Sequence, residues 1–310
     1  FVLLFIEFIY ILYLMVASLL SLSLLSFFLL VLLIFLLILP SSNEKPILYK
    51  ALNIDLEQYN FKNLKEKFGN NDIYISHSSS NGIDMDGDIK KTTLNAFCKI
   101  MNDEPDWYFK TEDEYDFLNI IGIKNNVIKK FDAIFDNYTN ILKKDCSFWL
   151  GGKGSTTSWH TDIDDLSYLY VIEGKKKIQF ISPKFNEKMY ERKIFTNGSK
   201  WSEIDFKNID YKKYPKFKDV KVECYILNAG DAIFIPKNWW HCVENLDETI
   251  GITYKIFRQE YMFSFIGKFF RKWYAKYNGY KMYDMNEIIQ KKISKKDLIK
   301  MKELILKNKG

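Results

Sequence analysis

The sequence predicts a mainly β protein with helical flanks, preceded by an N-terminal transmembrane helix. Residues 1–40 are almost wholly apolar, and Glu7 is their only charged residue. From about residue 143 to residue 260, short aromatic and β-branched runs are separated by Gly, Asn, Asp and Pro. Many short strands with such punctuation are typical of an antiparallel sandwich or barrel. Helical spacing returns on both sides of this region.

The apolar segment is long enough to be a membrane anchor. A spanning helix needs roughly 20 apolar residues, and the stretch from Val16 to Leu39 alone satisfies this before Pro40 ends it. A secretory signal peptide has a shorter apolar region of roughly 7–15 residues, so we expect an uncleaved, single-pass anchor. The chain begins with Phe1 rather than methionine, so Met15 is an alternative start, and a fragment is a further alternative.

The flanking residues leave the side of the membrane open. Lys45 and Lys50 follow the apolar segment, and positive charge near a span favours a cytosolic location for that flank. Two glycosylation sequons, at residues 137–139 and 197–199, would instead matter in a lumen. We therefore expect a membrane protein without assigning the side on which its folded part lies.

Composition divides the chain into four parts. They are a membrane anchor (1–40), a mixed α/β support (41–142), a β-rich core (143–260) and a basic helical segment (261–310). In the support, spacing and capping residues predict helices at residues 61–69, 92–101 and 126–142, and strands at residues 72–76 and 107–110. In the core, "VIEGKKKIQF" (171–180) is predicted to be a hairpin that turns at Gly174.

Positive charge is concentrated at the end of the chain. Residues 268–310 contain 13 Lys/Arg and 4 Asp/Glu, a net charge of +9 within a total of +6, which leaves −3 for the rest. The core is therefore not predicted to bind nucleic acid. The aromatic and basic run at residues 265–283 fits an anionic membrane surface, a nucleic acid backbone or a helical support. Ser294 is expected to cap a last helix.

The four cysteines, Cys98, Cys146, Cys224 and Cys242, include no Cys-x-x-Cys pair. This spacing argues against a zinc ribbon and against a thioredoxin-type motif. We expect them to be scattered, buried thiols, with disulfide bonds as the alternative.

Two of the three histidines lie where they could share a metal ion with a carboxylate. His160 and Asp162 are two residues apart, and side chains at positions i and i+2 of a strand point to the same face. His241 follows a strand-like run much further along the chain. Two histidines and one carboxylate on one side of a metal form the facial triad of non-haem Fe(II) oxygenases. His77, in the polar run "SHSSSNG", is expected to be a surface residue.

Three segments resemble the JmjC/cupin-like hydroxylases, a group that includes the asparaginyl hydroxylase acting on hypoxia-inducible factor. They are "GGKGSTTSWHTD" (151–162), "EGKKKIQFISP" (173–183) and "GDAIFIPKNWWHCVENL" (230–246), in the family's order. The resemblance covers roughly residues 106–257. It implies that the β-rich core is the catalytic part and is a double-stranded β-helix, the jelly-roll or cupin fold.

The same resemblance implies a role for each candidate site residue. His160, Asp162 and His241 would be both the metal ligands and the catalytic residues, and they would bind Fe(II). The co-substrate would be 2-oxoglutarate, whose distal carboxylate would be bound by Lys176. Strand alternation places Lys176 on the face opposite to that of its neighbours, Lys175 and Lys177.

Two hydroxyl groups would complete the binding of that carboxylate in the family pattern. Thr157, three residues before the first ligand, and Tyr108, in "WYFK", match the positions of these hydroxyls. The chain departs from the family pattern where many members have asparagine. Leu166 and Ser167 stand at one such place, and Lys255 and Ile256 stand near the other.

The resemblance implies oxidative decarboxylation of 2-oxoglutarate coupled to hydroxylation of a C–H bond. A protein or peptide side chain is the expected substrate. The alternatives are N-demethylation, which begins with the same hydroxylation, and hydroxylation of an RNA base. A metal-binding module that recruits partners without catalysis and a cupin that uses another metal without 2-oxoglutarate remain further alternatives.

Overall fold

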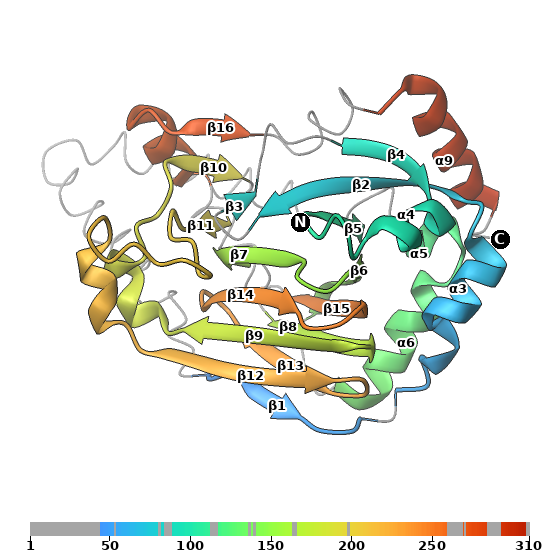
Figure 1. Ribbon diagram of the computed structural model, residues 1–310, viewed down its shortest axis with the longest axis horizontal. Coiled ribbons are helices and arrows are strands. Elements are labelled where there is room, and N and C mark those ends of the chain that lie inside the picture. The colour runs from blue at the N-terminus through green and yellow to red at the C-terminus, as the bar shows by residue number, and fades with distance from the viewer. Residues whose placement is uncertain are drawn as a thin grey trace, which may run out of the picture. The chain divides into compact units, whose positions relative to one another are not determined.

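Two antiparallel β-sheets form the centre of the protein in the computed structural model (Figure 1). The structure describes residues 44–52, 54–79, 82–83, 89–111, 117–135, 138, 141–162, 166–196, 199–258, 269, 271–283 and 293–307. The predicted anchor at residues 1–40 lies outside this set. None of the helices formed by the described residues is long and apolar enough to cross a membrane.

Within the described part of the chain, the larger sheet has nine strands and the smaller sheet has five. The larger sheet has the order β1-β13-β8-β15-β6-β5-β2-β3, with β4 paired to β2. Its strands are β1 (Ile47–Tyr49), β2 (Asp72–Ser79), β3 (Gly82–Ile83), β4 (Ile89–Thr93), β5 (Trp107–Thr111), β6 (Ile141–Gly151), β8 (Leu166–Glu173), β13 (Ala232–Pro236) and β15 (Thr249–Arg258). The smaller sheet has the order β11-β7-β14-β9-β12. Its strands are β7 (Thr156–Thr161), β9 (Lys175–Ile181), β11 (Lys200–Trp201), β12 (Val222–Asn228) and β14 (Trp240–Asn245).

The chain passes back and forth between the two sheets, as in a jelly roll. It alternates from β6 to β9 and again from β12 to β15. The predicted hairpin at Gly174 is therefore wrong, because β8 pairs with β13 and β15 whereas β9 pairs with β12 and β14. Gly174 instead carries the chain from one sheet to the other with φ +84°. A Cβ there would lie 1.9 Å from the carbonyl oxygen of Glu248.

Helices cover one face of the larger sheet. They are α3 (Phe61–Phe68), α4 (Leu94–Ile100), α5 (Phe117–Ile120) and α6 (Lys124–Phe135). On β15, Ile252 and Tyr254 pack against this helical layer, and Phe131 of α6 lies parallel to Tyr254 with the ring centroids 5.1 Å apart. Strand alternation therefore turns the odd-numbered residues of β15 toward the smaller sheet.

The helix predicted at residues 126–142 is shorter than expected. Its apolar face is present, since Val127, Phe131 and Phe135 are buried. However, α6 ends at Phe135, and Ile141 begins β6, where it pairs with Arg258. Pairing within the sheet overrides the helical spacing of the last residues.

Apolar side chains fill the space between the sheets and cover the outer face of the smaller sheet. The inter-sheet cluster includes Leu169 of β8 and Phe180 of β9, together with Trp239. The outer cluster includes Trp159 and Trp240. It is covered by the segment between β9 and β12, with η3 (Pro183–Lys188), β10 (Ile194–Thr196) and η4 (Pro215–Asp219).

The basic C-terminal segment packs partly on the β-rich region. A helical turn at residues 271–277 is held by an ion pair of 2.7 Å between Arg271 and Glu191, and β16 (Lys281–Tyr283) pairs with β10. The predicted cap of the last helix, α9 (Lys295–Lys307), is confirmed, because the Asp297 amide donates to Oγ of Ser294. The membrane and nucleic acid alternatives for this segment stay predictions.

The four cysteines carry free thiols. Cys146 and Cys242 are buried, Cys98 is half-buried and Cys224 is exposed. The prediction of scattered, buried thiols is therefore confirmed for Cys146 and Cys242 and wrong for Cys224, whose strand β12 lies at the edge of the smaller sheet.

Candidate metal and co-substrate site

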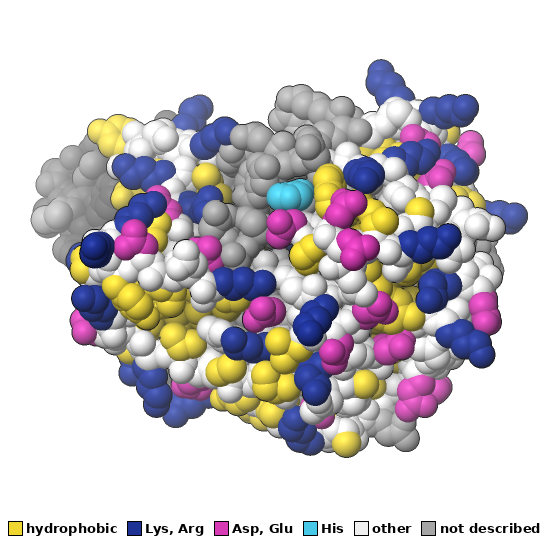
Figure 2. Space-filling view, in the orientation of Figure 1, with side chains coloured by type: hydrophobic (Ala, Val, Ile, Leu, Met, Phe, Trp, Pro, Cys, Tyr) yellow, Lys and Arg dark blue, Asp and Glu magenta, His cyan; other side chains and the backbone are white. Residues whose placement is uncertain are grey.

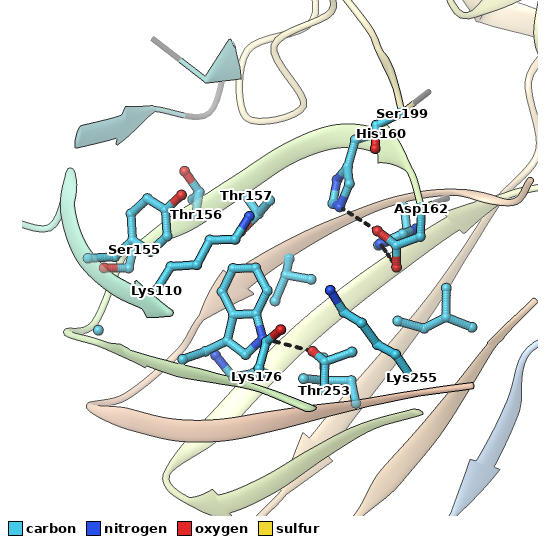
Figure 3. Close-up of a pocket in the computed structure, with 18 of the residues that line it drawn as sticks. Lys110, Ser155, Thr156, Thr157, His160, Asp162, Lys176, Ser199, Thr253 and Lys255 are labelled. Atoms are coloured by element: carbon cyan, nitrogen blue, oxygen red, sulfur yellow. Dashed lines mark hydrogen bonds and ion pairs between the residues drawn. The ribbon is translucent and has the colours of Figure 1, made fainter. Parts of the chain in front are cut away.

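A cavity of about 260 Å³ lies between the inner faces of the two sheets (Figure 3). The larger sheet contributes residues of β5, β6 and β15 to its wall, and the smaller sheet contributes residues of β7, β9 and β14. All six site residues proposed from the sequence line this one cavity: Tyr108, Thr157, His160, Asp162, Lys176 and His241.

The pairing of β7 with β14 brings His160 and His241 together. The two residues lie directly opposite each other, and their ring centroids are 4.1 Å apart. Both side chains are buried. Trp201, which pairs with His160 across β11 and β7, stacks on its imidazole with a centroid distance of 4.6 Å. This stacking restricts the orientation of the ring.

Asp162 lies one residue beyond the end of β7, rather than within the strand. Its Oδ1 is 3.5 Å from Nε2 of His160, and its Oδ2 is 3.6 Å from Nε2 of His241. The candidate ligand atoms of the three residues all lie within 4.8 Å of one another. Figure 3 shows His160 and Asp162 turned toward each other at the same end of the cavity.

A backbone carbonyl fixes the other nitrogen of each imidazole. Nδ1 of His160 lies 2.8 Å from the carbonyl oxygen of Ser158, and Nδ1 of His241 lies 3.2 Å from that of Trp239. Since a carbonyl oxygen only accepts, both Nδ1 atoms carry the hydrogen, and both Nε2 lone pairs face the carboxylate of Asp162. Lone pairs and a carboxylate repel each other unless a cation lies between them. The donor set therefore fits a divalent transition metal.

The protonation states also suit metal binding. Burial, followed by the neighbouring His160, lowers the pKa of His241 to about 4, so this imidazole is neutral near pH 7. Burial opposes ionisation of Asp162, but His241 and His160, when they are protonated, together with Lys255 hold the pKa of its carboxyl below the usual value. Neutral imidazole and carboxylate are the forms that bind a metal ion.

Lys176 places a buried amino group in the same cavity. Lys176 is 5% exposed, and its Nζ donates to Oδ1 of Asn245 at 2.7 Å. Burial lowers the pKa of Lys176 to about 7. Lys175 and Lys177 are only half-buried and do not line the cavity, as strand alternation predicted. Without a ligand, this ammonium has no carboxylate partner among the described residues, so an anionic ligand would stabilise its charged form.

A bulge in β7 places Thr157 on the same side as His160. A spacing of three residues would put the two side chains on opposite faces of a regular strand. His241 of β14 pairs with His160 of β7, and the next pair is Val243 with Thr157. The two pairs are two residues apart on β14 but three residues apart on β7, so β7 contains one extra residue. The extra residue turns Thr157 toward the cavity, which it lines.

Tyr108 belongs to a wall of aromatic and polar groups. It lies on β5, and its ring is parallel to that of Trp149, with the centroids 6.4 Å apart. Nε1 of Trp149 donates to Oγ1 of Thr253 at 2.8 Å, and Nζ of Lys110 lies 4.8 Å from the Trp149 ring centroid. These contacts connect the Tyr108 side of the cavity to β6 and β15.

Three further residues join the site although they were not predicted as site residues. Asn245 has the strand parity of His241 on β14, so alternation could have indicated it, whereas the sequence signal for Lys255 was its place near a position where many family members have asparagine. Trp201 carried no such signal, because its position depends on the pairing of β11 with β7. His77, on β2, packs against Trp107 of β5 and does not line the cavity.

The paired sheets and the His–Asp–His cluster define a cupin-like jelly roll with a candidate metal centre. A family model described as a cupin-like domain matches residues 51–259, and the chain belongs to this family. The matched range contains all six proposed site residues.

Several curated proteins are similar to part of the chain. HSPB1-associated protein 1 from Bos taurus is 25% identical over 134 residues, and JmjC domain-containing protein D from Dictyostelium discoideum is 37% identical over 107 residues. Lysine-specific demethylase 8 from Xenopus tropicalis is 31% identical over 108 residues. These alignments cover 38%, 34% and 34% of this chain and 28%, 23% and 24% of the relatives. The chain thus spans about a quarter of the length of the curated relatives it matches.

Proposed function

We propose that this protein is an Fe(II)- and 2-oxoglutarate-dependent oxygenase. The observation that carries the proposal is that one cavity contains both the His160, Asp162 and His241 cluster and the buried amino group of Lys176. The cupin-like family and the JmjC relatives support this assignment. A protein that only bound a metal would have no need for a buried lysine in the same cavity.

The described residues fit the two groups that the activity requires. Two imidazole nitrogens and one carboxylate would hold Fe(II), and Lys176, with the hydroxyls of Thr157 and Tyr108, would hold the distal carboxylate of 2-oxoglutarate. When bound, these groups supply the O2-dependent oxidation of a C–H bond.

The protein itself would contribute orientation, charge and exclusion of water. The carbonyls of Ser158 and Trp239 keep the metal-binding nitrogens unprotonated, and Trp201 holds the His160 ring. Lys176 is buried, so its ammonium would stabilise a carboxylate at a position with little access to water.

The proposed substrate is a protein side chain, which would be hydroxylated. The names of two relatives, HSPB1-associated protein 1 and Lysine-specific demethylase 8, favour protein partners or substrates. The second name also supports N-demethylation as an alternative outcome, because an N-methyl group hydroxylated at the same site loses formaldehyde. We further propose that residues 1–40 anchor the protein in a membrane, on the basis of their apolar sequence.

Release of succinate tests the proposed activity. The 310-residue chain, purified in detergent, would be incubated with Fe(II), ascorbate and 2-oxoglutarate, with and without candidate peptides. Succinate should form with the unsubstituted protein and should be absent with His160→Ala. Equal succinate from both proteins, or none from either, would favour a binding module instead. Peptide products with one added oxygen indicate hydroxylation, whereas formaldehyde indicates demethylation.

A further inference from the structure

Lys255, on β15, is one of the four lysines that line the cavity, with Lys110, Lys143 and Lys176. The odd-numbered residues Gly251, Thr253, Lys255 and Phe257 lie on the inner face of β15, and all except Gly251 line the cavity. Figure 3 shows the amino group of Lys255 directed toward the end of the cavity that contains Asp162.

Lys176 and Lys255 approach the cavity at different points along β15. The stem of Lys176 crosses the strand at Gly251, where a Cβ would lie 2.9 Å from Cε of Lys176. Lys255 is four residues further along, which corresponds to roughly 13 Å at the usual rise of a strand. The amino group of Lys176 therefore lies at the end of the cavity that contains Asn245. The amino group of Lys255 is directed toward the other end (Figure 3), which contains His160, Asp162 and His241.

Charge balance favours an anion at both ends. The candidate metal ligands contribute one carboxylate, so a divalent ion there would leave a charge of +1. Lys255 adds a second positive charge at that end, and Lys176 places one at the other, so a dicarboxylate of charge −2 would meet positive charge at both of its ends. The carboxylate beside the metal would use one oxygen as a ligand, and its second oxygen would be free to accept from a donor in the cavity wall.

We propose that Lys255 forms a second carboxylate subsite, which binds the metal-end carboxylate of a 2-oxo acid. This inference rests on the proposed function and adds a recognition residue to it. Lys176 and Lys255 would then select a short ligand with a carboxylate at each end. The ammonium of Lys255 donates hydrogen bonds to the oxygen that the metal leaves unused.

A competing interpretation is that Lys255 replaces the metal. In that case the ammonium of Lys255 would pair with the Asp162 carboxylate and neutralise its charge, and no divalent ion would be needed there. The two interpretations predict opposite effects of removing the charge. If Lys255 binds the ligand, the metal affinity should change little and the ligand affinity should fall. If Lys255 replaces the metal, its removal should increase the metal affinity and should not weaken ligand binding.

Calorimetric titration without oxygen distinguishes these interpretations without depending on turnover. The 310-residue chain in detergent would be loaded with Mn(II) and titrated with 2-oxoglutarate and with 2-oxopentanoate, which lacks the distal carboxylate. Lys255→Met should weaken both ligands by about tenfold to a hundredfold, the loss expected for one charge-assisted hydrogen bond. Lys176→Met should weaken 2-oxoglutarate similarly and change 2-oxopentanoate by less than about twofold.

Two controls separate this subsite from general damage. Lys177→Met removes a lysine whose side chain is directed away from the cavity, so both affinities should stay unchanged. Lys255→Arg retains the charge and should recover part of the affinity. Unchanged binding of both ligands by Lys255→Met, or tighter Mn(II) binding by it, would overturn the subsite while leaving the proposed function intact. An unsubstituted protein that binds Mn(II) but neither ligand would overturn both.

Discussion

The side chain of Lys176 passes directly over the backbone of Gly251. A Cβ added to Gly251 would lie 2.9 Å from Cε of Lys176 and 3.3 Å from the carbonyl oxygen of Tyr170. Atoms essentially never approach a Cβ as closely as the first of these distances, so the absence of a side chain on β15 gives the lysine its route into the cavity. Gly251 is therefore part of the co-substrate site although it contributes no functional group.

We expect Gly251→Ala to displace Lys176 and to weaken 2-oxoglutarate binding by about tenfold, with a loss of about 1–3 kcal/mol in the free energy of unfolding from overpacking. Titration calorimetry and denaturant unfolding measure the two effects. In a Lys176→Ala background the same glycine substitution should cost almost nothing further in ligand binding. Equal losses of affinity in the two backgrounds would show that Gly251 acts independently of Lys176.

The affinity for 2-oxoglutarate should decrease as the pH rises above 7. Burial lowers the pKa of Lys176 to about 7 in the ligand-free protein, so the ammonium form that binds a carboxylate becomes scarce above this pH. The dissociation constant should be nearly constant from pH 6 to 7 and should then rise by about tenfold per pH unit. His241, with a pKa lowered to about 4, stays neutral throughout. A flat profile between pH 7 and 9 would contradict this role of Lys176.

Asn245→Asp should replace a neutral partner of Lys176 by an anionic one. The new carboxylate would raise the pKa of Lys176 and would compete with the ligand for its charge, since Asn245 Oδ1 already lies 2.7 Å from Nζ. We expect 2-oxoglutarate to bind at least about tenfold more weakly, with a flatter pH dependence between pH 7 and 9. Asn278→Asp, on the surface of the C-terminal segment, is the control and should retain both properties of the unsubstituted protein.

Trp201 is a positioning residue for His160. Its ring stacks on the imidazole with a centroid distance of 4.6 Å and an interplanar angle of 11°. Trp201→Ala should reduce the affinity for Mn(II) by about tenfold to a hundredfold, the usual effect of removing a group that orients a metal ligand. Trp201→Phe preserves an aromatic face and should restore most of the affinity. If both variants bind the metal equally weakly, stacking is not the cause.

Strand alternation and the family resemblance together predicted six of the residues that line the cavity: alternation put His160 and Asp162 on one face, whereas the roles of Lys176, Thr157 and Tyr108 came from the resemblance. His160 and Asp162 share a parity, Lys176 faces the opposite way from its neighbours, and His241 lies opposite His160 in the sheet. The strands of the core were predicted for a similar reason, because their apolar faces follow the two-residue period.

The features that were missed depend on pairing between distant segments. The bulge that turns Thr157 inward exists only in the register between β7 and β14. The change of sheet at Gly174 depends on the partners of β8 and β9, since a glycine turn between two strands also fits a hairpin. The end of α6 is set by the pairing of β6 with β15. None of these relations is encoded in local sequence spacing.

Anaerobic Fe(II) binding tests most directly the claim that His160, Asp162 and His241 form one metal centre. The chain contains only three histidines, so each can be replaced by alanine in turn, and His77 provides a matched control on β2 that does not line the cavity. The unsubstituted protein and His77→Ala should each bind one Fe(II) per chain. His160→Ala and His241→Ala should bind it at least about a hundredfold more weakly while remaining folded. Undiminished Fe(II) binding by His160→Ala and His241→Ala would contradict the assignment of this metal centre.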